Sequence, residues 1–309
     1  MGEGSQRAIV AAMLANLGLA VAKFVAFLAT GASSMLAESI HSVADTGNQG
    51  LLFWGGRSAR REPTPEHAFG FGRERYFWAF IVALVLFSLG AVFAIYEGLH
   101  KVRHPEPLVR MGWAIGVLLF GVVLETFSLR TAVVEAREPK GSSTWWEYIR
   151  HSKSPEIPVV LLEDCGALFG LVLALTGIGL VALTGDPRWD GYMTIAIGAL
   201  LGVIAIVIAI EMKSLLIGES ATLATTNEIV DALESHPRVR RVIHMRTQHM
   251  GPDQLLVAAK IEFDAQLSIA DLASVIDEAE VGVRERVPIA VRIYLEPDLQ
   301  REVEAATSP

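Results

Sequence analysis

The fold class is decided by one stretch of the sequence, PVVLLEDCGALFGLVLALTGIGLVAL at residues 158–183. Its only charged residues are the adjacent acids Glu163 and Asp164. A hydrocarbon core about 30 Å thick needs roughly 20 such residues in a helix, whose backbone groups bond within the segment. The chain contains five further runs of this kind, at Ala8–Thr30, Ser34–Trp54, Phe77–Tyr96, Trp113–Arg130 and Tyr192–Ile210. We therefore expect an α-helical membrane protein with a bundle of six transmembrane helices.

The composition of the 309 residues supports a membrane protein and excludes several other classes. Hydrophobic residues make up 52% of the chain, charged residues make up 19%, and the mean hydropathy is +0.42. The net charge of −8 provides no field that would attract nucleic acid. Cys165 is the only cysteine, so the sequence predicts neither an internal disulfide nor a cysteine-rich zinc module.

The last third of the chain is expected to be a separate domain. Residues 212–309 contain 16 of the 34 acidic residues but only 10 of the 26 Lys and Arg. Their periodicities predict the order α-β-β-α-β. The elements are a helix from Thr226 or Asn227 to about 236, a hairpin over 239–263, a helix after Ser268 and a strand at Ile289–Leu295. We assign residues 1–211 to the transmembrane domain and 212–309 to a ferredoxin-like domain for dimerisation and regulation.

Basic residues in the short connections predict the orientation of the bundle. The connections between the second and third spans and between the fourth and fifth spans contain five Lys or Arg each. Cytoplasmic loops have such an excess, so both chain ends and the tail domain are expected in the cytoplasm. No Arg-rich transit segment precedes the first span, which favours a cell membrane, plasma or bacterial inner, over an organelle.

The second span contains a pair of residues with metal-binding chemistry. His41 and Asp45 are four residues apart, so they share one helix face at a distance of about 6 Å. Imidazole together with carboxylate suits Zn²⁺, whereas Mg²⁺ or Ca²⁺ would require oxygen ligands alone. Glu38 lies on the same face one turn earlier. The alternative is a hydrogen-bonded pair that holds helices together, but we favour the metal site.

The fifth span contributes two acids that cannot both be ionised near the middle of a bilayer without a cation or proton between them. We expect Asp164 to be the third ligand, with Glu163 either sharing the site or facing another groove. Glu125 in the fourth span has three possible roles: fourth ligand, proton carrier or partner of a basic group. Lys23 in the first span is expected to pair with one of the acids, and Cys165 to be a packing residue.

Three motifs resemble one known family, the cation diffusion facilitators. They are SMLAESIHSVADTGNQ at 34–49, HAFGFGRE at 67–74 and YEG at 96–98. The resemblance covers almost the whole chain and implies a homodimer that exports Zn²⁺ or a related divalent cation from the cytoplasm in exchange for protons. It also implies that His41 and Asp45 form one half of the transport site and Asp164 part of the other. The candidates for proton-coupling or auxiliary roles are Glu38, Glu125, Asn48 and His67.

Departures from the family pattern bear on the choice of metal. Val160 stands where the family usually has a histidine, four residues before Asp164, and Glu163 is present as in a divergent branch. A site with one imidazole and several carboxylates is harder, so Mn²⁺, Fe²⁺ and Co²⁺ are alternatives to Zn²⁺. The resemblance also implies that the tail binds few or no metals, because Ala259 and Tyr294 stand at positions that bind zinc in zinc-exporting members of the family.

The sequence thus predicts a secondary transporter in a lipid bilayer, rather than an enzyme, and without a prosthetic group. One alternative is a non-transporting metal sensor or subunit, motivated by the missing histidine. Another is a membrane enzyme that activates water on a metal, although the short loops leave little room for a substrate. Dimerisation is expected through the tail, whose strand edges would otherwise be exposed. The tail histidines His236, His244 and His249 are expected at the surface.

Overall fold

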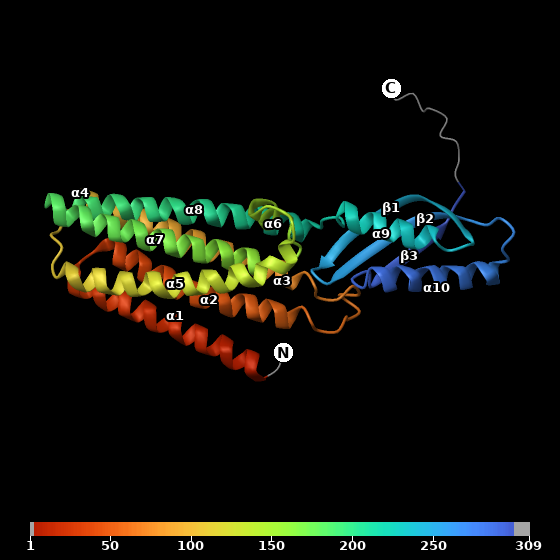
Figure 1. Cartoon of the computed structure of the whole chain (residues 1–309), viewed down its shortest axis with the longest axis horizontal. Helices are drawn as coiled ribbons and strands as arrows, with labels where there is room; N and C mark the ends of the chain where they lie inside the picture. Colours follow the sequence, from red (N-terminus) through yellow and green to blue (C-terminus); the bar gives the residue numbers. More distant parts are fainter. Residues whose placement is uncertain (1–2, 300–309) are drawn as a thin grey trace, which may run out of the picture. The chain divides into compact units, whose positions relative to one another are not determined.

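The computed structural model describes residues 3–299, with side chains from residue 16 onward, and divides the chain into two compact units. The first unit comprises Met1–Ser58 and Glu74–Lys213, and the second comprises Ala59–Arg73 and Ser214–Pro309. Figure 1 shows long helices in the first unit and a small sheet with helices in the second. The predicted division after residue 211 stays a prediction, and the structure adds that the connection 59–73 groups with the second unit.

The first unit is built from long helices. Five of the six predicted spans each lie within one helix, and the span Phe77–Tyr96 lies within the continuous helical segment Glu74–Arg103. Among the described residues, four helical segments are long and apolar enough to cross a membrane: Glu74–Arg103, Met111–Lys140, Glu156–Thr184 and Arg188–Ile217. The first of these contains a π-helical segment, η1. The elements are α1 (Glu3–Thr30), α2 (Ser33–Ser58), α3 (Glu74–Val85), η1 (Leu86–Val92), α4 (Phe93–Arg103), α5 (Met111–Lys140), α6 (Trp145–His151), α7 (Glu156–Thr184) and α8 (Arg188–Ile217).

Helix α7 begins two residues earlier than the sequence predicts, at Glu156 instead of Pro158. Proline is tolerated in the first turn of a helix, because the N–H that it lacks would have no partner within the helix there. Asp164 consequently lies more than two turns into α7. Asp164 is therefore farther from the start of its helix than it would be if the helix began at Pro158.

Asp190, near the start of α8, caps the start of α2. Its carboxylate accepts hydrogen bonds from the backbone N–H of Ser33 at 2.7 Å and of Ser34 at 3.4 Å, and from the Ser34 hydroxyl at 2.5 Å. The side chain is fully buried, and α2 has no acid in its own first turn. The first N–H groups of a helix lack partners within the helix and carry partial positive charge, which a carboxylate satisfies. Asp190 thereby fixes one end of the helix that carries His41 and Asp45.

We expect Asp190→Ala to lower the thermal stability of the purified protein, because buried N–H groups at the start of α2 lose their acceptor. Each buried donor left without a partner costs about 1–3 kcal/mol. Asp190→Asn keeps one acceptor oxygen and should lose less. Melting in detergent, followed by intrinsic fluorescence, compares the two variants with the parent protein. An unchanged melting temperature in Asp190→Ala would contradict the capping role.

The second unit contains the predicted α-β-β-α-β order in a ferredoxin-like arrangement. Its sheet has the strand order β1-β2-β3, in which β1 pairs antiparallel with β2, and β2 pairs parallel with β3. Alternate residues of the central strand, from Leu255 to Phe263, are buried and pack with residues of both helices in one core. The elements are α9 (Leu223–Glu234), β1 (Val239–Gly251), β2 (Gln254–Phe263), α10 (Ile269–Arg286) and β3 (Arg292–Pro297).

Three details of the tail differ from the sequence prediction. Helix α9 begins at Leu223, because the Thr222 hydroxyl accepts a hydrogen bond from the N–H of Thr225 and caps the helix one turn earlier than predicted. The last strand is β3 (Arg292–Pro297) instead of Ile289–Leu295. His249 is only 3% exposed, so its predicted surface position was wrong. The backbone N–H of His249 donates to the carbonyl oxygen of Glu219, which ties β1 to the segment before α9.

The connection 59–73 packs within the second unit. A Cβ atom at Gly72 would lie 2.5 Å from the carbonyl oxygen of Met250, so the two backbones touch at a position that only glycine permits. The guanidinium of Arg73 lies 3.5 Å from the sulfur of Met250. His67 is exposed and its ring lies 4.6 Å from that of Phe71, measured between ring centres. The loop that follows α2 is therefore held by the end of the β1–β2 hairpin.

Candidate metal site

His41 and Asp45 lie on one face of α2, as their spacing predicts. The Nδ1 atom of His41 is 3.5 Å from the Oδ1 atom of Asp45, and the imidazole is 1% exposed. Within the described residues, neither ring nitrogen of His41 nor Oδ1 of Asp45 has a hydrogen-bond partner. Buried polar atoms without partners cost free energy, so each such atom in a native structure calls for an explanation, such as a bound water molecule or ion. This pair is therefore the first indication of an ion-binding function.

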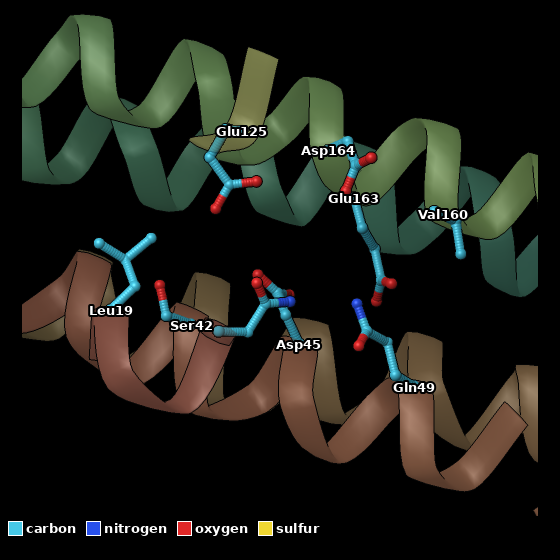
Figure 2. Close-up of a pocket in the computed structure, with 9 residues that line it drawn as sticks. Leu19, Ser42, Asp45, Gln49, Glu125, Val160, Glu163 and Asp164 are labelled. Carbon is cyan, nitrogen blue, oxygen red and sulfur yellow. The ribbon is translucent and has the colours of Figure 1, made fainter. Parts of the chain in front are cut away.

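A small polar cavity opens beside Asp45, between helices α1, α2, α5 and α7. Its volume is about 10 Å³, which is close to the minimum for one water molecule. Figure 2 shows Asp45 from α2 facing Glu125 from α5 and Glu163 from α7 across the cavity. The lining residues are Asn16, Leu19, Ser42, Asp45, Gln49, Glu125, Val160, Glu163 and Asp164.

The adjacent acids of α7 have different partners. Glu163 accepts a hydrogen bond of 2.7 Å from the side-chain amide of Asn48 on α2. Asp164 accepts one of 2.9 Å from the hydroxyl of Ser128 on α5. Neighbouring residues on a helix point about 100° apart, which allows this division. Hydrogen bonds of this kind orient carboxylates that bind metals, so Asn48 and Ser128 are positioned to hold the two acids in place.

The cavity contains more acidic groups than its protein surroundings neutralise. Four of the residues that line it are carboxylic acids. Carboxylates crowded into a buried site cannot all be ionised unless cations or protons are present between them. Lys23 is occupied nearby, because its ammonium pairs with Glu38 at 3.0 Å, which confirms the predicted pairing of Lys23 with an acid. The arrangement can therefore hold either protons or a metal cation.

The predicted ligands do not form a closed metal site in this structure. No three His, Cys, Asp or Glu side chains of the described residues are close enough to hold one ion together. The lining of the cavity does not include His41. Two of the auxiliary candidates are not among the lining residues: Glu38 pairs with Lys23, and His67 belongs to the second unit. Asn48 and Glu125 lie beside the acids of the cavity.

Sequence reasoning did not include four polar residues around the site: Asn16, Ser42, Gln49 and Ser128. Gln49 follows Asp45 by four residues, so helical spacing alone could have placed it on the same face. Ser42 follows His41 in the sequence, and Ser42 rather than His41 is among the residues that line the cavity. Asn16 and Ser128 reach the site through the packing of α1 and α5, which no local pattern specifies.

Comparisons with known proteins give consistent matches along the chain. Two family models match: the cation efflux transmembrane domain over residues 9–217 and the cytoplasmic domain of cation efflux proteins over 223–298. The chain is 34% identical over 248 residues to the mitochondrial proton-coupled zinc antiporter SLC30A9 of Mus musculus, which covers 79% of this chain and 44% of that protein. It is 29% identical over 267 residues to metal tolerance protein C4 of Arabidopsis thaliana, which covers 86% of this chain and 58% of that protein. The chain thus spans about half the length of these curated relatives.

These comparisons correct the expected location in a cell membrane. The SLC30A9 proteins of Mus musculus and Homo sapiens are both mitochondrial by name, so these relatives contradict a plasma or bacterial inner membrane. The expectation rested on the lack of a transit segment before the first span, and the point at which a sequence begins does not establish location. The expectation of a protein that crosses its membrane several times is confirmed by the transmembrane family model.

Proposed function

Because this chain belongs to the cation efflux family, we propose that it exports Zn²⁺ across its membrane in exchange for protons. Family membership supports a role as a transporter of metal cations rather than as an enzyme. The choice of Zn²⁺ and of protons rests on the SLC30A9 relative, which is named a proton-coupled zinc antiporter. The observation that carries the proposal is the unpartnered His41–Asp45 pair beside a cavity lined by four acids.

We propose that His41, Asp45 and Asp164 bind the transported ion, with Glu163 as a fourth ligand. The imidazole and carboxylates form a mixed nitrogen and oxygen set, which Zn²⁺ accepts in tetrahedral geometry. Two of the proposed ligands have buried atoms without hydrogen-bond partners, so an ion would satisfy groups that are costly to leave unpaired. Asn48 and Ser128 would orient the two acids of α7 toward that ion.

The exchange with protons follows from the chemistry of these ligands. A carboxylate or imidazole that binds a metal must first lose its proton, so metal and proton compete for the same atoms. When the ion leaves, protons must return to the cavity acids, because their charges would otherwise repel one another in a buried site. Glu125 lines the same cavity on a different helix. We therefore assign it the role of proton carrier rather than ligand.

We propose that the protein acts as a homodimer joined through the tail domain. The match of residues 223–298 to the cytoplasmic domain of cation efflux proteins supports this arrangement. Strands β1 and β3 are the two edges of the sheet. Exposed edges favour pairing with another chain. The ion would then leave the compartment that contains the tail domain.

The proposal is tested by uptake into liposomes that contain the purified protein. We expect the steady-state accumulation of Zn²⁺ inside the liposomes to rise at least about tenfold when a proton gradient is imposed, a concentration ratio equivalent to about 1.4 kcal/mol of driving force. Mn²⁺, Fe²⁺ and Co²⁺, which the carboxylate-rich site also accommodates, should enter more slowly. A protonophore and protein-free liposomes are the controls. Uptake that does not respond to the gradient would contradict proton exchange, and no uptake by a folded dimer would favour the metal-sensor alternative.

A further inference from the structure

A completely buried ion pair lies next to the proposed transport site. The ammonium of Lys23 on α1 donates to Oε2 of Glu38 on α2 at 3.0 Å, and both side chains are 0% exposed. The same ammonium donates to the hydroxyl of Ser42 at 2.8 Å. Burying two charges is expensive even when they are paired, and ionisable residues within membrane spans usually have a functional reason to persist.

The surrounding helices provide the room that this pair occupies. Gly170 on α7 faces Oε1 of Glu38 so closely that any Cβ atom at this position would collide with it. Gly121 on α5 lies beside the stem of Lys23: a Cβ atom there would make an ordinary contact with Cε at 3.8 Å, and it would lie closer to Leu171, at 3.2 Å. Oε1 of Glu38 has no hydrogen-bond partner among the described residues. The pair is therefore enclosed by four helices, and the carboxylate of Glu38 is only partly satisfied by Lys23.

Ser42 connects this pair to the cavity. Its hydroxyl accepts the hydrogen bond from Lys23, and its side chain also lines the cavity with Asp45 and Glu125. The positive charge of Lys23 consequently lies at the wall of the proposed ion site. A like charge acts strongly on a bound cation in such a place, because the effective dielectric of a buried site is far below that of water.

We propose that Lys23 is a positioning residue that weakens cation binding in the cavity, so that the transported ion can leave. The inference rests on the proposed function. Four carboxylic acids line the cavity, and without an opposing charge they would hold a divalent ion tightly. Transport requires an ion to bind firmly enough to enter the site and weakly enough to leave it. Glu38 sets the strength of the effect, because it neutralises part of the charge of Lys23.

The proposal predicts effects of opposite sign for the two members of the pair. Lys23→Met removes the charge and keeps an unbranched stem, so it should bind Zn²⁺ at least about tenfold more tightly. Its transport should show a lower KM and a lower kcat, because release becomes slow. Glu38→Gln leaves the ammonium without its counterion and should weaken Zn²⁺ binding at least about tenfold. The double variant Lys23→Met with Glu38→Gln should have an affinity between those of the two single variants and somewhat above that of the parent protein.

The experiment measures Zn²⁺ binding by calorimetry on the full-length protein in detergent, together with transport in liposomes. A purely structural pair would change melting temperature without moving affinity in opposite directions. Equal Zn²⁺ affinity in the parent protein and in all folded variants would overturn the inference. If Lys23→Met does not fold, Glu38→Gln and the double variant still test the inference. A parent-like Zn²⁺ affinity in Glu38→Gln would contradict it. Absence of Zn²⁺ binding by the parent protein would instead overturn the proposed function.

Discussion

Replacing Asp45 with asparagine is expected to reduce proton-driven Zn²⁺ uptake at least about a hundredfold. Asp45 connects the two parts of the proposed site, because its carboxylate lies 3.5 Å from the His41 imidazole and its side chain also lines the cavity. Loss of a residue that merely orients a metal ligand costs about 10- to 100-fold in affinity, and loss of a direct ligand should cost more. The variant retains the size and hydrogen-bonding capacity of the side chain, so the fold should be preserved. Initial rates of uptake into liposomes measure the effect.

The acids of α7 provide a comparison within the same assay. Asp164→Asn should cause a loss as large as that in Asp45→Asn. Glu163→Gln should lose only about tenfold, because the Glu163 carboxylate is shared with the amide of Asn48 and its loss leaves the three principal ligands in place. Asp231 is exposed on α9, so Asp231→Asn is a matched control that should leave uptake unchanged. A larger loss in Glu163→Gln than in Asp164→Asn would show that Glu163, not Asp164, is the principal ligand from this helix.

Much of the architecture could be predicted because local signals specify each element. Apolar length alone predicted the long helices of the first unit, and the alternation along Leu255–Phe263 predicted the central strand β2. The helix predicted after Ser268 is α10, and the structure adds that the Ser268 hydroxyl caps it by accepting from the N–H of Asp271. The start of α9 was less certain, because several threonines precede the helix and each has the chemistry of a cap. Local chemistry therefore decides which element forms more reliably than where it begins.

The contacts that shape the site could not be predicted in the same way, because they join residues that are distant in the sequence. The Asn48–Glu163 hydrogen bond spans 115 positions, and the Ser33–Asp190 contact spans 157. Helical spacing placed His41 and Asp45 on one face, but it did not show that only Asp45 would line the cavity. That result depends on the rotation of α2 against its neighbours. Such rotation is set by packing across the bundle and leaves no pattern within a single helix.

Val160→His is expected to increase Zn²⁺ affinity at least about tenfold, equivalent to about 1.4 kcal/mol of binding free energy. Val160 lines the cavity four residues before Asp164, so an imidazole there would share a helix face with that acid. The new pair on α7 would repeat the arrangement of His41 and Asp45 on α2. Imidazole nitrogen favours Zn²⁺ over the harder Mn²⁺. The affinity for Mn²⁺ should therefore change much less, and the selectivity for Zn²⁺ should rise.

Competition between the protein and a fluorescent chelator, measured separately for Zn²⁺ and Mn²⁺, would detect this change in selectivity. Val160→Asn is the matched control, because it adds a polar side chain without an imidazole and should not improve the preference for Zn²⁺. Equal increases for both metals would mean that the imidazole acts only through general polarity of the cavity. An unchanged Zn²⁺ affinity would mean that position 160 does not face the bound ion. If Val160→His raises Zn²⁺ affinity as expected, the native valine favours release of the ion. A second imidazole at position 160 would hold Zn²⁺ more tightly and slow the release step.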